Sequence, residues 1–365
     1  MLSSRKGYMY LQQLNTMERT IFEIFIDKVA KKQYPSGIGL FAGQSGILLA
    51  LESLPMPMLQ DTESIAENLL DCIIEKMKTL CDTSFDQGLA GIGYVMNEIH
   101  KSKRINGDID NILENVDAAI YRLLTNERIC VPTGITNGAL GYLIYLISRL
   151  DNDGHNTDSF SHSVIIESIK ICLNNICNNM PSRFYNLSRD ISISLLWDYP
   201  ICIYLIGKLI EKDILSHKLK YLIKSWLFYF SGLIPYYNLN KLYLGSALSF
   251  IQSKLRFREL DNIIANLFYA VDIRQTEEEI SRRILNINEG WPFASFVISK
   301  SVDLLPHNHI RYPELSNLKQ KIDSSTGELL RRGLQNKLDL SLINGISGVL
   351  YLNSYTHLIP KKSDL

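Results

Sequence analysis

The stretch LFAGQSGILLAL, residues 40–51, joins a Gly43-x-x-Gly46 turn directly to an apolar helix, and this combination recurs along the chain. Small residues in the first turn of a helix let neighbouring backbones approach closely. The first three copies lie 45 and 50 residues apart, which is enough chain for two helices and two loops. The pattern therefore predicts a repeat protein built from pairs of helices. The other clear copies have their paired glycines at Gly88 and Gly91, Gly138 and Gly141, and Gly345 and Gly348.

Amphipathic helices are predicted between these turns. From Asp108 to Leu124 the apolar residues follow one helical face, and Asp108 is placed to cap the helix. Ser64 and Glu67 have the spacing of a capping box, which opens a helix expected to run to Leu80. Strand-like alternation is scarce, so the sequence predicts an all-α fold.

The chain has room for seven helix pairs. Gly345 lies 207 residues after Gly138, a distance that accommodates three further pairs at the same spacing. These pairs lack a clear Gly-x-x-Gly turn. We expect their degenerate turns near Leu196–Pro200, Leu242–Ala247 and Asn288–Phe293.

Composition limits the domain organisation and the partners. A chain of 365 residues, of which 46% are hydrophobic, can bury a large core. Lys and Arg number 38 and so do Asp and Glu, which argues against nucleic acid or an anionic membrane surface as the main partner. We expect a single domain over residues 37–365, preceded by an N-terminal helical segment over residues 1–36 that packs on it.

Cysteine usage and hydropathy indicate the compartment. The six cysteines form no Cys-x-x-Cys pair, and most lie in apolar helical runs, as buried residues of a reducing compartment do. The first residues show no signal-peptide cleavage site. The most apolar later stretch, Ser225–Tyr237, is too short to span a bilayer. We therefore expect a cytoplasmic protein without a transmembrane segment.

Four segments resemble the repeat signatures of the lanthionine synthetase C-like (LanC-like) cyclase family. The resemblance covers roughly residues 37–353 and implies an α/α toroid, a double ring of seven inner and seven outer helices. It also implies a bacterial, lanthipeptide-type peptide-modification pathway, in which a zinc ion at the centre of the ring activates a peptide cysteine for addition to a dehydrated Ser or Thr. The segments LFAGQSGILLAL (40–51), FDQGLAGIGYVM (85–96), TNGALGYLIYL (136–146) and LINGISGVLYL (342–352) resemble the first, second, third and seventh signatures.

The resemblance fails at the positions that carry the family's chemistry. Leu242 stands where the Trp-Cys-Tyr-Gly turn of the family's fifth repeat has its zinc-binding Cys. Asn288 and Glu289 stand where the Cys-His-Gly turn of the sixth repeat has two more ligands. Trp197 replaces the His of the fourth repeat, and Gly134 replaces an Asp frequent in the third. Catalytic zinc needs three protein ligands, which Leu, Asn and Glu do not supply. We therefore expect no zinc and no other cofactor.

The mouth of the ring is the expected functional site. With the zinc ligands absent, we expect a pseudoenzyme that holds a peptide substrate or a partner maturation enzyme without turnover. Aromatic side chains of the degenerate turns can line such a groove, although core filling explains them equally well. The candidate residues are Trp197, Asp198, Tyr243, Asn288, Glu289 and Trp291.

A metal-free enzyme is the main alternative. Asp198 and Glu289 can act as acid and base, as in a hydrolase with glycosidase-like chemistry. As first-turn residues they can also simply cap their helices, and this interpretation is favoured. An unrelated α/α-barrel glycosidase or terpenoid cyclase is disfavoured, because no Asp-x-Asp-Asp run or Gln-Trp repeat is present.

Three further groups of polar or thiol residues are interpreted as structural. His307 and His309 lie on a loop without another soft ligand nearby, so a surface loop is expected. Cys172 and Cys177 are expected in the core of a helix. Residues 151–156 are rich in Asp and Asn but lack the spacing of a calcium loop.

Overall fold

The structure is a computed structural model that describes residues 16–54, 62–102, 107–151, 160–184, 193–281, 286–305, 309, 311–322 and 339–357. Within these ranges every regular element is a helix, so the expected all-α class is confirmed. The elements are α2 (Thr16–Ala30), α3 (Gln44–Glu52), α5 (Glu63–Met77), α6 (Leu89–Lys101), α7 (Ile109–Thr125), α8 (Ala139–Arg149), α9 (Phe160–Phe184), α10 (Asp198–Glu211), α11 (Ser216–Ser231), α12 (Asn238–Leu255), α13 (Arg258–Tyr269), α14 (Ile273–Ser281), α15 (Trp291–Leu304) and α17 (Ile346–His357).

Two kinds of helix alternate along the chain. The helices that follow glycine turns are buried on nearly all sides: eight of the nine residues of α3 and ten of the eleven of α8 are buried. The helices between them bury one stripe only, as in α5, where Ala66, Leu69 and Ile73 are the buried residues. A helix that is apolar all round needs neighbours on every side, whereas an amphipathic helix can cover a core and face water. The alternation therefore gives two layers of helices.

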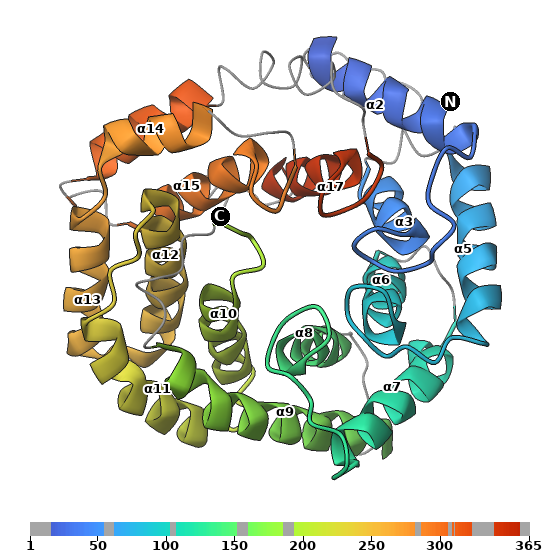
Figure 1. The fold of residues 1–365 in the computed structure, drawn as a ribbon, viewed down its shortest axis with the longest axis horizontal. Coiled ribbons are helices and arrows are strands. Elements are labelled where there is room, and N and C mark those ends of the chain that lie inside the picture. Colours follow the sequence, from blue (N-terminus) through green and yellow to red (C-terminus); the bar gives the residue numbers. More distant parts are fainter. Residues whose placement is uncertain are drawn as a thin grey trace. The chain divides into compact units, whose positions relative to one another are not determined.

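The chain divides into two compact units, residues 1–116, 284–292 and 324–365, and residues 117–283 and 293–323. In the second unit α8, α10 and α12 pack side by side, and α9, α11 and α13 form a layer against them (Figure 1). Each of α8, α10 and α12 packs against the amphipathic helix that follows it. In the first unit α3 packs against α5, α6 and α17, and α2 packs against α17.

The first glycine of each turn ends a loop that folds back onto the start of its helix. Gly43, Gly88 and Gly138 are the N-caps of α3, α6 and α8, with extended backbones and no side-chain cap. The first helical N–H donates instead to the carbonyl seven residues earlier. These bonds join Gln44 to Gly37, Leu89 to Asp82, Ala139 to Pro132 and Ile346 to Asp339, at 2.8–2.9 Å.

The second glycine of each turn is a point of close approach. A Cβ at Gly91 would overlap the carbonyl oxygen of Phe85 and lie 2.9 Å from the Cβ of Leu40, which belongs to the preceding copy. Gly91 thus makes space for its own loop and for a buried side chain of another copy. The same relation holds at Gly46 with Leu40 and Leu342, and at Gly348 with Leu342 and Ile287.

A buried ion pair joins α7 to α8. Asp117 accepts hydrogen bonds from Arg149 Nη2 at 3.0 Å and from the hydroxyl of Tyr145 at 2.5 Å. Arg149 and Tyr145 have no exposed surface. Removing one member of a buried pair leaves an uncompensated charge and typically costs about 3–5 kcal/mol. The contact therefore fixes the register of the two helices.

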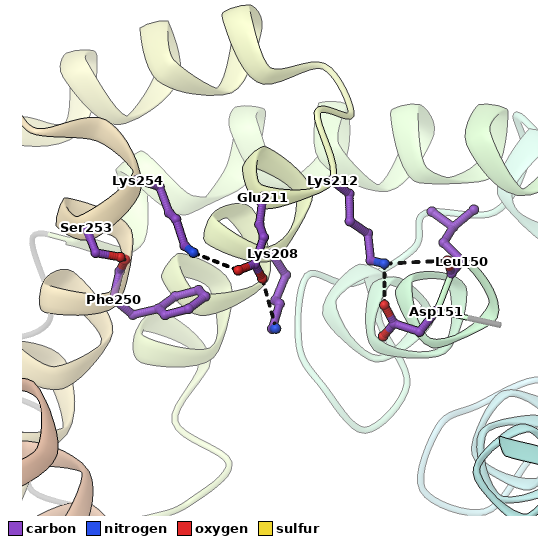
Figure 2. Close-up of polar contacts among 8 residues, drawn as sticks. All are labelled: Leu150, Asp151, Lys208, Glu211, Lys212, Phe250, Ser253 and Lys254. Carbon is purple, nitrogen blue, oxygen red and sulfur yellow. Dashed lines mark hydrogen bonds and ion pairs between the residues drawn. The ribbon is translucent and has the colours of Figure 1, made fainter. Parts of the chain in front are cut away.

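Polar contacts also join the C-terminal ends of α8, α10 and α12. Glu211 of α10 accepts hydrogen bonds from Lys208 at 3.0 Å and from Lys254 of α12 at 2.6 Å. Lys212, directly after α10, pairs with Asp151 at the end of α8 (Figure 2). Half-exposed ion pairs contribute about 0–1 kcal/mol each. They help to orient the helices, and the packed core supplies most of the stability.

Candidate functional site

The six candidate residues fall into both units. Trp197, Asp198 and Tyr243 belong to the unit of residues 117–283 and 293–323. Asn288, Glu289 and Trp291 belong to the unit that includes residues 284–292. Each group is described below by itself, and a shared cavity stays a prediction.

Trp197 and Asp198 form the start of α10. Trp197 is the N-cap residue, and Asp198 is the first residue of the helix, where the helix dipole favours a carboxylate. The indole of Trp197 is only 5% exposed and packs against Tyr199, with 5.9 Å between the ring centroids. The carboxylate of Asp198 lies beside the loop before α8, where a Cβ at Gly134 would be 4.0 Å from its Oδ2. Gly134 stands where the family's third repeat frequently has an Asp. In this chain the carboxylate of Asp198 lies next to that loop position.

Tyr243 belongs to an aromatic cluster in the same unit. Its ring lies 6.5 Å from that of Trp197 and 5.3 Å from that of Phe293, centroid to centroid. Its hydroxyl donates to the carbonyl of Leu195 at 3.1 Å. Burial raises the pKa of the Tyr243 phenol well above its usual value, so the hydroxyl remains protonated. The rings of this cluster pack against one another, which favours a structural role for them over direct contact with a ligand.

The fifth repeat begins earlier than the sequence predicts. α12 starts at Asn238, so Leu242–Ala247 lie inside the helix, and the turn expected there is wrong. Leu242 is fully buried. The turn before α12 ends at Tyr237, which is the N-cap.

Glu279 of α14 closes the N-terminus of α12. Its two carboxylate oxygens accept the backbone N–H groups of Asn238 at 2.9 Å and Leu239 at 3.1 Å. The side chain of Asn238 accepts hydrogen bonds from Lys241 and from the backbone of Asp272. Sequence reasoning missed Glu279, because the residue lies 41 positions after the helix start that it caps and no local motif marks it.

The turn of the sixth repeat is where the sequence predicts it. Asn288 and Glu289 lie in a turn that ends at Gly290, directly before α15. The backbone N–H of Glu289 donates to Asn286 Oδ1 at 2.9 Å, and that of Ile287 donates to the carbonyl of Ile343 at 3.2 Å. Trp291 follows, 3% exposed, and its indole N–H has no acceptor among the described residues. A buried donor of this kind can serve a ligand carbonyl or a water molecule.

The residues that the structure describes do not fit the zinc ion implied by the resemblance. They include no group of three or more His, Cys, Asp or Glu side chains that could hold a metal. Cys172 and Cys202 are buried, and burial raises the pKa of both thiols far above the usual value, which disfavours the thiolate that binds zinc. The ring of His309 packs against Phe268.

Of the residues interpreted as structural, some lie outside the described ranges. His307 does, as do residues 152–156. Cys172 is buried in α9 as expected, and Cys177 is partly buried there. Asp151 pairs with Lys212. None of the described helices has the length and apolar character needed to cross a membrane.

Two layers of paired helices, with Gly-x-x-Gly turns at the starts of the buried ones, define a helical repeat protein of the α/α type. A solved structure described as nisin cyclase matches this chain with a TM-score of 0.66 at 14% identity, covering 94% of this chain and 95% of that one. The likeness extends over nearly the whole chain and shows the fold, an α/α toroid. No family model and no curated protein matches the sequence.

Proposed function

We propose that this protein is a LanC-like member of a lanthipeptide-type peptide-modification pathway that binds a peptide or a partner enzyme without cyclising it. The observation that carries the proposal is a cyclase-like fold over 94% of the chain. The resemblance of the repeat signatures supports it at the site, because it puts no Cys or His at the three expected ligand positions. In the register of the resemblance these positions hold Leu242 in one turn, and Asn288 and Glu289 in the other.

A chain that binds no zinc would lack the family's means of activating a nucleophile. A peptide cysteine has a pKa of about 8.5 and is mostly thiol at neutral pH. Zinc in the family makes the thiolate available for addition, and the buried phenol of Tyr243 and the buried thiols of Cys172 and Cys202 offer no base in its place. Tyr243 keeps its proton, and the described cysteines of highest burial, Cys172 and Cys202, keep theirs.

The first backbone N–H groups of α3, α6, α8 and α12 are hydrogen-bonded within the chain. Open N-termini of helices favour an anion, and a thiolate on a metal is one such anion. At α12 the carboxylate of Glu279 takes this place, and at α3, α6 and α8 the loop carbonyls accept the first N–H groups. Because these N–H groups already have acceptors within the chain, they do not need an anion, which supports a site without a catalytic ion.

Binding is supported by the buried indole N–H of Trp291. It is a directed donor without an acceptor in the described structure, next to a turn that is predicted to face the site. Peptide carbonyls are matched acceptors. Asp198 and Glu289 belong to different units, and the two-carboxylate enzyme stays the alternative proposal.

The test combines metal analysis, a cyclisation assay and a binding assay on the full chain. We expect far less than one zinc per chain after dialysis, and no faster cyclisation of a dehydrated, Cys-containing peptide than in buffer. One zinc per chain together with accelerated cyclisation would contradict the proposal. Trp291→Phe should weaken peptide binding about fivefold to tenfold by removing one buried hydrogen bond. Trp226→Phe, a buried indole in α11, is the matched control and should bind as the wild type does.

A further inference from the structure

Exposed apolar side chains gather in and after α11. Four of the most exposed large hydrophobic side chains among the described residues lie between positions 221 and 236. They are Phe228 at 78% exposure, Tyr221 at 73%, Tyr236 at 70% and Ile234 at 55%. Single exposed apolar residues are ordinary, but four within sixteen residues mark a surface that something covers.

On α11 the exposed aromatics form a crest opposite the buried stripe. Tyr221 and Phe228 are seven residues apart, which places them within about 20° of each other around the helix. The buried side of the helix packs onto the core, and α9, α10 and α13 contact it (Figure 1). The buried residues are Leu219, Ile223, Trp226 and Phe230.

The same segment is free of acidic residues. Residues 214–258 contain no Asp or Glu, in a chain whose acidic and basic residues are equal in number. Lys220 and Lys224 are exposed beside the crest and make no ion pair with any described residue. Lys218, on the other flank, donates to Asn174 of α9. The basic residues of the segment are Lys218, Lys220, Lys224, Lys241, Lys254, Arg256 and Arg258.

The helices that contact α11 contribute few acids. In α10, Glu211 is paired with Lys208 and Lys254, and Asp213, just before α11, accepts a hydrogen bond from Ser216. In α9, the acidic residue Glu167 is paired with Lys170. In α13, Glu259 and Asp261 lie in the first turn, and Asp261 accepts a hydrogen bond from Gln252. Although the net charge of the whole chain is zero, the exposed face of α11 is therefore locally basic and apolar.

The geometry points to a membrane-surface site: Tyr221 and Phe228 of α11 enter the headgroup region of an anionic bilayer while Lys218, Lys220 and Lys224 lie over its phosphates. Amphipathic aromatics at the interface and lysines that reach the headgroups are the chemistry of peripheral attachment. A convex crest suits a deformable lipid surface, whereas anchor residues of protein interfaces sit in packed pockets. The site is independent of the proposed peptide-binding function, since it lies on α11.

Vesicle co-sedimentation of the full chain tests the inference. We expect binding to an equal mixture of phosphatidylcholine and phosphatidylglycerol, and at least about tenfold weaker binding to phosphatidylcholine alone. Tyr221→Ser with Phe228→Ser should reduce partitioning about tenfold or more. Lys220→Gln with Lys224→Gln should reduce it roughly thirtyfold and flatten its salt dependence.

Phe160→Ser is the matched control, since Phe160 is 83% exposed but lies outside the acid-free segment. It should leave partitioning unchanged. Far-UV circular dichroism checks that each variant is folded, and the lysine pair gives a second, independent arm if the aromatic pair is not. Equal binding to both vesicles, or no binding, overturns the inference. Loss of self-association in the crest variants without any effect on lipid also overturns it and assigns the face to a second copy of the chain.

Discussion

A methyl group added at the second glycine of a turn meets backbone atoms, which cannot rotate aside as a side chain can. At Gly348 it would overlap the carbonyl oxygen of Leu342 and lie 2.8 Å from the side chain of Ile287. The clash can be relieved only by moving the helix against its own loop. Packing thus dictates the residue type at these positions, and the repeat is visible in the sequence for that reason.

Gly91→Ala tests this at one residue. Its Cβ would overlap the Phe85 carbonyl oxygen, so we expect a loss of about 3 kcal/mol of unfolding free energy, at the upper end of the range for overpacking. Urea denaturation followed by circular dichroism measures it. Gly37→Ala is the control, since nothing lies within 4 Å of a Cβ there, and it should change stability by no more than about 0.5 kcal/mol. Equal effects of the two substitutions would show that glycine is not required for packing.

At the scale of the elements, the sequence predicts helix starts wherever a residue of the turn itself determines them. α3, α6, α8 and α17 each begin one residue after the first glycine of a turn, as expected. Asp108 accepts the N–H of Asp110 at the start of α7, which confirms that cap. The box at Ser64 is wrong, because α5 begins at Glu63 after Thr62.

α12 shows why other starts are not predictable. It begins without a glycine, and its cap comes from Glu279 on another helix. A contact between distant segments leaves no periodic pattern in the sequence. The sequence therefore predicts a turn at Leu242–Ala247, residues that lie inside α12. The same limit applies to the candidate site, whose residues were found by position in a repeat while their packing partners were not.

Glu279→Ala should destabilise the protein by about 1–2 kcal/mol, because the variant loses two bonds to the first N–H groups of α12 and a favourable charge at its positive end. Glu279→Gln keeps an acceptor and should lose less than the alanine variant. Thermal and urea denaturation give both values. Glu67→Gln, an exposed residue of α5, is the control and should be close to neutral. If Glu279→Ala matches that control, the carboxylate does not cap α12 in solution.

At the scale of the whole molecule, the α/α fold class follows from the repeat, since four clear turns with helix-length spacing permit few other arrangements. The repeat does not predict where the chain divides into its two compact units. The unit boundaries at residues 116 and 292 fall inside α7 and α15, which are continuous helices. Domain boundaries ordinarily fall in exposed linkers where few contacts cross. The expectation that residues 37–365 fold as a single domain stays a prediction.

Single-domain behaviour predicts that buried thiols of one unit become reactive only when helix is lost throughout the chain. Cys172 and Cys202 are buried in the second unit, and burial raises their thiol pKa, so both should be inert to a thiol reagent in the native protein. Cys81 and Cys130 are exposed and should react at once, and Cys72 and Cys177 are partly exposed. Cys72→Ser, Cys81→Ser, Cys130→Ser and Cys177→Ser together remove the background. In that variant, labelling of Cys172 and Cys202 should rise at the same urea concentration as the loss of far-UV circular dichroism, because cooperative unfolding gives coincident transitions by different probes. Labelling that is complete while about half of the helix signal remains would mean that the units unfold separately, and the single-domain expectation would then be wrong.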